Sequence, residues 1–111
     1  MPRLIIAGPA AEEFRSALAN LAVLSEAAAV KLHGRVLRRL DDLERYPEFG
    51  RLRPEYADWL PDVRSSAVNP LVLFYHQPRP DTVEVVRIVD ARQDLPALLG
   101  LISQDEDQGE N

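Results

Sequence analysis

The chain has 111 residues and a formal net charge of −5, from 13 basic and 18 acidic side chains. A hydrophobic fraction of 46% and a charged fraction of 28% exclude wholesale disorder, and the lack of cysteine excludes disulfides, a thiol nucleophile and a cysteine zinc site. Four of the acidic residues lie in the last nine positions, which leaves 13 basic against 14 acidic groups in residues 1–102. That near-neutral part gives no general attraction to nucleic acid.

The first half of the sequence predicts a strand and two helices. Arg3–Ala7 is short and apolar and ends at a Gly-Pro turn, as a strand does. Pro9 suits the first turn of a helix, and Ser25 can cap a second helix that ends at Tyr46, before Pro47. Apolar residues recur at steps of three and four along both helices, at Phe14, Ala17, Leu18, Leu21 and Leu24 and then at Ala29, Leu32, Val36, Leu40 and Leu43. The short break between the helices predicts an antiparallel helical hairpin.

Two residues widen the apolar stripe of the second helix. Val30 and Leu37 lie beside its main line. A stripe wider than one sheet face can cover is a candidate groove for a partner helix.

The second half of the sequence predicts three strands and a short helix. Pro47–Pro61 carries three aromatic residues and is expected to pack on the core, with Trp59 and Tyr75 as core residues. The predicted strands are Asp62–Val68, Leu71–His76 and Thr82–Val89, with turns at Asn69-Pro70 and Gln77–Asp81. Asp94 can cap a helix over Leu95–Ile102.

The predicted order of elements is β-α-α-β-β-β-α. Helices and strands that are grouped in this way indicate an α+β fold, with the helical hairpin packed on a mostly antiparallel four-stranded sheet. We expect one domain over residues 1–102 and a flexible acidic tail over residues 103–111. The apolar stretch at the N-terminus is too short for a signal peptide, so a cytoplasmic protein is expected.

The chemistry that the sequence offers comes mainly from arginine. His33 and His76 have no metal-ligand spacing, and we expect no metal and no cofactor. Five arginines follow the helices, at Arg51, Arg53, Arg64, Arg87 and Arg92. Arg64 and Arg87 are expected to project from the same sheet face. The set is either a group of salt bridges on a solvated face or a surface for phosphate or an acidic partner.

An ordered series of segments resembles the RelE/ParE toxin superfamily of type II toxin–antitoxin systems. The end of the second helix, Leu40–Arg51, resembles the family's Leu-rich helix end followed by Pro-x-x-Gly-Arg. The Val63-Arg64 pair, the apolar strand that ends in Tyr75, the Val83–Val89 strand and the Asp90–Asp94 segment match in the same order. The resemblance covers about residues 3 to 95 and implies the fold expected above.

The resemblance also implies a partner and a target. A small antitoxin would wrap the toxin and neutralise it, with Val30 and Leu37 as the antitoxin-binding residues. RelE-like members cleave mRNA in the ribosome, whereas ParE-like members inhibit DNA gyrase. Asp90 stands where many nuclease relatives have His, and no His or Tyr follows it. General acid–base cleavage needs such a group, so the ParE-like branch is favoured.

Two alternatives stay open beside the gyrase inhibitor. A ribosome-dependent mRNA endonuclease would use Arg64, Arg87 and Arg92 as phosphate clamps. An inactive homologue would bind only its antitoxin. For the gyrase inhibitor, the expected target-binding residues are Arg51, Arg64, Arg87 and Arg92, and no sequence-specific DNA binding by the toxin alone is expected.

Overall fold

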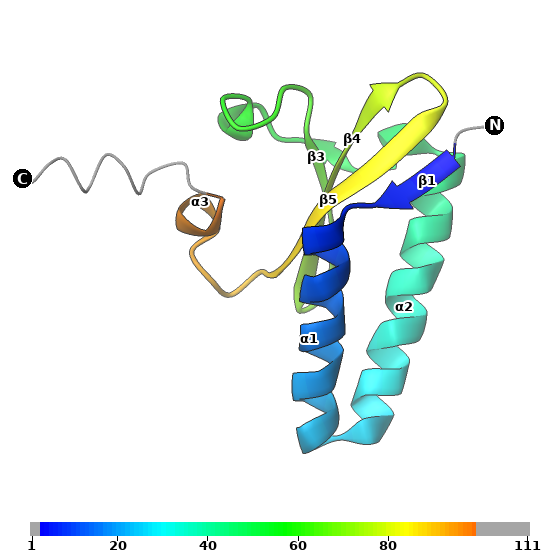
Figure 1. Cartoon of the computed structure of the whole chain (residues 1–111), viewed down its shortest axis with the longest axis vertical. Helices are drawn as coiled ribbons and strands as arrows, with labels where there is room; N and C mark the ends of the chain where they lie inside the picture. The colour runs from blue at the N-terminus through cyan, green and yellow to red at the C-terminus, as the bar shows by residue number, and fades with distance from the viewer. Residues whose placement is uncertain (1–2, 100–111) are drawn as a thin grey trace, which may run out of the picture.

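The structure, a computed structural model, describes residues 3–99 and has an α+β fold (Figure 1). The order of helices and strands is the predicted one, with one extra strand and two short 3₁₀ turns. The elements are β1 (Arg3–Ile6), α1 (Gly8–Leu24), α2 (Glu26–Arg45), η1 (Pro47–Phe49), β2 (Arg51–Leu52), η2 (Pro54–Tyr56), β3 (Arg64–Val68), β4 (Leu71–Arg79), β5 (Thr82–Asp90) and α3 (Leu95–Leu98).

The sheet has five strands in the order β1-β5-β4-β3-β2, so the expectation of four strands is wrong. Strand β1 runs parallel to β5, and the other pairs are antiparallel. The missed strand, β2, has only two residues, too few to show a period of two. Strand β4 continues to Arg79, so the predicted turn over Gln77–Asp81 shrinks to Pro80 and Asp81.

The helical hairpin forms as predicted, because Ser25 is the only residue between the helices. The Ser25 hydroxyl accepts a hydrogen bond from the Ala28 amide at 3.1 Å and caps α2. The five-residue stripe predicted for α2 is its buried set. Leu24 is 83% exposed, contrary to the stripe predicted for α1, because the hairpin extends past the end of the sheet (Figure 1).

Both faces of the sheet carry an apolar cluster. The helices cover one face, where Tyr75, Leu73, Val83 and Val85 meet the buried stripe of α2. The other cluster is built on Phe74 and includes Tyr56, Val63, Val72, Val89 and Leu99. Tyr75 is fully buried, as predicted. Trp59 is only half-buried, because it packs edge-on against Phe74 at the margin of the second cluster.

Side chains from the helices occupy backbone groups at the sheet edges. Glu13 accepts from the Ile88 amide at 2.9 Å, where β5 has passed the end of its pairing with β1. The Leu4 amide donates to Glu44 at 3.1 Å, and Arg39 donates to the Ala67 carbonyl of β3 at 2.7 Å. The hairpin therefore holds the sheet by polar contacts as well as by its apolar face.

The last described element is α3, a single turn. Asp94 caps it by accepting a hydrogen bond from the Ala97 amide. The remainder of the helix predicted to Ile102 and the acidic tail over residues 103–111 lie outside the described residues. Among the described helices, none is long and apolar enough to cross a membrane.

The Tyr75 hydroxyl fixes the segment that leaves α2. It donates to the Pro47 carbonyl and accepts from the Gly50 amide, both at 2.7 Å. Burial raises the pKa of Tyr75, so the hydroxyl keeps the proton that it donates. Gly50 has an ordinary φ of −79°, and what it supplies is space: a Cβ there would lie 2.6 Å from the Tyr75 oxygen and 2.7 Å from the Ser65 carbonyl.

We expect Gly50→Ala to lower the free energy of unfolding by about 1–3 kcal/mol, because a methyl group would overpack this contact. Gly34→Ala is the matched control, since the nearest atom to its Cβ is the end of the Arg38 side chain at 4.0 Å. In a helix interior that change raises stability by about 0.5–1 kcal/mol. Urea denaturation of both variants measures the difference, and equal effects would contradict the steric explanation.

Candidate functional site

The expected pairing of Arg64 and Arg87 on one sheet face is wrong. Arg64 lies opposite Tyr75, and Arg87 lies opposite Phe74. Residues directly opposite each other in a ladder point to the same side of the sheet. Tyr75 belongs to the cluster under the helices and Phe74 to the cluster on the other face, so the two arginines lie on opposite faces.

Arg64 completes the contact made by Tyr75. Its guanidinium donates to the Gly50 carbonyl at 2.8 Å and to the Glu48 carbonyl at 3.3 Å. The three segments of the resemblance that end in Gly50-Arg51, Arg64 and Tyr75 thus meet in one hydrogen-bonded network. This contact assigns Arg64 a structural role.

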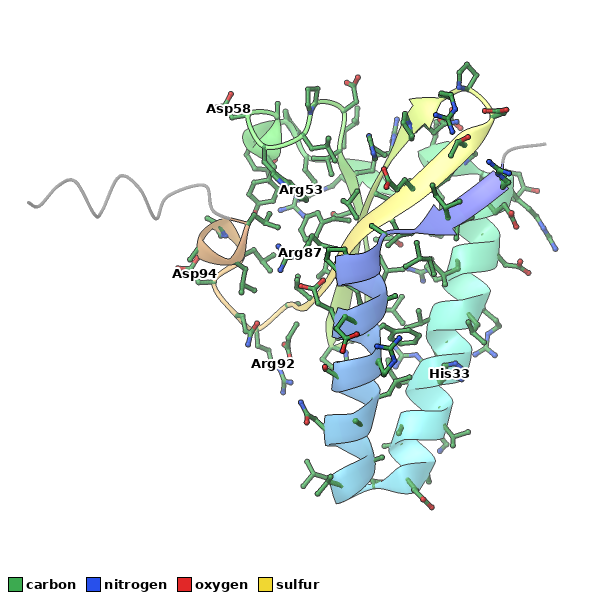
Figure 2. The ribbon with its side chains drawn as sticks, in the orientation of Figure 1. His33, Arg53, Asp58, Arg87, Arg92 and Asp94 are labelled. Atoms are coloured by element: carbon green, nitrogen blue, oxygen red, sulfur yellow. The ribbon has the colours of Figure 1, made fainter. Side chains whose placement is uncertain are left out.

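Arg87 joins three elements (Figure 2). It forms a two-nitrogen ion pair with Glu13 of α1, with Nε to Oε2 at 2.8 Å, and donates to the Leu98 carbonyl of α3 at 3.2 Å. Both partners of the ion pair are about three-quarters buried. Breaking such a pair leaves one charge partly buried and unpaired, so Arg87 also contributes to the fold.

Arg51 and Arg53 flank the second face of the sheet. Arg53 donates to the Ser65 hydroxyl at 2.9 Å and to Glu55 at 2.8 Å, and its guanidinium lies 5.0 Å from the Tyr56 ring centroid. Arg51, opposite Ser65, is exposed. Of this pair, Arg51 is therefore the one whose side chain is available to a partner.

The two histidines lie on different elements, α2 and β4. His33 stacks on Phe14 between the helices, with ring centroids 5.8 Å apart. His76 Nε2 lies 2.9 Å from Glu84. Within residues 3–99, Arg64 and Arg87 lie on opposite faces of the sheet, and His76 lines a hollow of about 290 Å³ together with Arg64. Over the same residues, no group of three potential metal ligands occurs.

The hairpin presents an exposed apolar surface. Val30 is 70% exposed and Leu37 is 48% exposed, as their place beside the α2 stripe predicts. Leu37 lines a hollow of about 480 Å³ together with Leu4 of β1 and Leu40 and Glu44 of α2. We call Val30, Leu37 and this hollow the hairpin groove. Sequence reasoning missed the part from β1, because a short apolar strand looks like a core strand until its place at the sheet edge is known.

Arg92 is paired with Asp90, the last residue of β5. Its Nε donates to Asp90 Oδ1 at 2.9 Å, and its backbone amide donates to the same oxygen. The hydrogen bonds from the Arg92 side chain lower the pKa of Asp90 to about 2. Asp90 is therefore a carboxylate at neutral pH and has no proton to give as a general acid.

We expect the pKa of Asp90 to rise from about 2 toward its ordinary value of 3.8 in Arg92→Gln. Because the folded pKa lies below the unfolded one, the pair stabilises the fold above about pH 4 and loses this contribution as the pH falls toward 2. Arg92 is exposed, so the contribution to stability is small. Carboxyl NMR titration measures the pKa, with Arg51→Gln as the control that leaves it low. A pKa near 3.8 in the unchanged protein would contradict the pairing.

One family model matches most of the chain. The family model described as the ParE toxin of the type II toxin–antitoxin system parDE matches residues 4–95. A comparison with curated proteins returned no match. The matched range runs from β1 to the first residue of α3 and includes the helical hairpin, all of the sheet beyond its first residue, and Arg51, Arg64, Arg87 and Arg92. The chain therefore belongs to the ParE toxin family of the RelE/ParE superfamily, the toxins of type II toxin–antitoxin systems.

Proposed function

We propose that this toxin is held inactive by a cognate antitoxin and, when free, inhibits DNA gyrase by surface contact. The observation that carries the proposal is that the arginines expected to bind phosphate make contacts within the fold. Arg64 and Arg87 bind groups of the fold on opposite faces, and Asp90 takes the place of an acid–base residue. Cleavage of RNA needs cations and a proton-transfer group around one phosphate. A binding inhibitor needs only a complementary surface.

The hairpin groove supports the antitoxin part of the proposal. Val30 and Leu37 directly follow the buried residues Ala29 and Val36 and lie about two turns apart on α2. Residues 3–99 leave this side of the helix exposed. An amphipathic helix that lays its apolar face on such a groove buries these side chains. ParE toxins pair with an antitoxin, and this surface is the one that we assign to it.

The exposed arginines support the target part. Arg51 and Arg92 are exposed, and Arg92 pairs only with the neighbouring Asp90 among the described residues, whereas Arg64 and Arg87 are held by contacts between elements of the fold. Of the four arginines expected to bind the target, Arg51 and Arg92 are the two that we propose to contact it. Arginine is suited to such contacts because its planar group pairs with carboxylates at protein interfaces.

We expect Leu37→Ala to weaken antitoxin binding about tenfold, which corresponds to about 1.4 kcal/mol. Leu52→Ala is the control, since Leu52 is 47% exposed, close to the 48% of Leu37, but lies on β2 outside the hairpin groove. Isothermal titration with the product of the adjacent gene measures both affinities. Equal losses, or no binding by the unchanged toxin, would remove the groove as the antitoxin site.

We expect the purified toxin to block supercoiling by gyrase and to leave mRNA on translating ribosomes intact. Arg51→Gln and Arg92→Gln should each weaken inhibition by about 1–2 kcal/mol, or 5- to 30-fold. Arg15→Gln on α1 is the control, because Arg15 is also exposed and its ion pair within residues 3–99 is with Glu12 of the same helix. Cuts at codon boundaries would replace the gyrase assignment with the nuclease. No effect on either system would point to the inactive homologue.

A further inference from the structure

A second group of arginines lies on the side of α2 that overhangs β3. A hollow of about 420 Å³ there is lined by four arginines and two carboxylates, Arg35, Arg38, Arg39, Arg45, Asp41 and Asp42, with β3 as its floor. We call the four arginines the arginine track. They lie between residues 35 and 45 of one helix, a rise of about 15 Å, so they form an elongated charged surface. It is separate from Arg51 and Arg92, and of its four arginines only Arg38 also lines the hollow of the hairpin groove.

Two of the four guanidinium groups are held in place by β3 and the turn after it. Arg35 donates to the Asn69 carbonyl at 2.9 Å, and Arg39 donates to the Ser66 hydroxyl at 2.6 Å and the Ala67 carbonyl at 2.7 Å. These contacts use one nitrogen of each group. A ligand that binds here meets cations that are already ordered, which lowers the entropy cost of binding.

The positive charge of the hollow is incompletely neutralised by its own carboxylates. Asp42 lies 3.8 Å from Arg39 and Asp41 lies 4.0 Å from Arg45, both longer than hydrogen bonds. The Arg39 Nε is buried, and it has no hydrogen-bond partner within residues 3–99. Arg38 forms no ion pair among the described residues. Four cations against two anions leave an excess that favours an anionic ligand.

An exposed aromatic ring decides between kinds of anion. Phe49 is 52% exposed, and the Arg39 guanidinium lies 5.1 Å from its ring centroid. Tyr46, directly after the last residue of α2, is also exposed. Acidic peptides need cations alone, whereas single-stranded nucleic acid is bound by cations that follow the backbone and by aromatic rings on which bases stack. Cations beside exposed rings match the second pattern.

We propose that the arginine track binds the phosphate backbone of single-stranded nucleic acid, with Phe49 as a stacking surface for a base. The net charge of −5 works against long-range attraction, so binding rests on local contacts. Affinity should lie in the non-specific range, about 10⁻⁴–10⁻⁶ M, and should fall steeply with salt. The arginines are proposed to contact phosphates, which carry no sequence information, so no sequence preference is expected.

The test is fluorescence anisotropy of short single-stranded DNA and RNA with the antitoxin-free toxin, at several salt concentrations between about 50 and 200 mM. Arg38→Gln and Arg45→Gln should each weaken binding a few-fold and lower the salt slope by about 0.7. Phe49→Leu should weaken oligonucleotide binding at least about fivefold and leave competition by inorganic phosphate unchanged. Melting curves confirm that each variant is folded.

Arg15→Gln is again the matched control, because it removes the same charge from an exposed site on the other helix. Binding that is retained in this variant and lost in Arg38→Gln and Arg45→Gln supports the proposal. Three outcomes overturn it: no oligonucleotide binding, equal losses in all arginine variants, or tighter binding of a polyglutamate peptide than of the oligonucleotides. Because gyrase and antitoxin are absent from the assay, its result does not depend on the proposed toxin activity.

Discussion

The hydroxyl of Tyr75 connects the centre of the sheet to the segment that leaves α2, and much of the molecule depends on that connection. It satisfies the buried Gly50 amide and the Pro47 carbonyl at once. A buried backbone donor without a partner costs about 1–3 kcal/mol, so the hydroxyl and the absent side chain at Gly50 act together. With η1 fixed in this way, Arg51 and Leu52 reach β3 and add the fifth strand. Arg64 closes the same contact from β3.

The sequence predicts the parts of the fold that repeat over many residues. The α2 stripe spans four turns, and its five apolar positions are the ones that are buried. Features that are short, or that depend on how strands pair, are not predicted from the sequence. Strand β2 has two residues and no readable period. The faces of Arg64 and Arg87 depend on the register of three strands, and register is set by turns whose geometry one sequence does not fix.

The candidate surfaces likewise contain residues that the sequence indicates and residues that only the structure reveals. Val30 and Leu37 could be named in advance, because a stripe that is too wide for one sheet face is visible in the helical period. The rest of the hairpin groove could not be named from the sequence, because it includes Leu4, which lies on a strand at the sheet edge beside α2. The arginine track could not be predicted from the sequence, for a related reason. Its residues have the pattern of a solvated helix face, and only the structure shows that α2 overhangs β3 and binds carbonyl groups of β3 and of the turn after it.

The polar side chains at the sheet edges have a consequence for colloidal behaviour. Unpaired strand edges can pair with another chain and so begin aggregation. Here Glu13 takes the Ile88 amide, Glu44 takes the Leu4 amide and Arg39 takes the Ala67 carbonyl, each from a helix that the core already holds in place. Three positions at which a second copy could add a strand are thus occupied from within. The contacts that hold the helices to the sheet thus also oppose edge-to-edge pairing between copies of the chain.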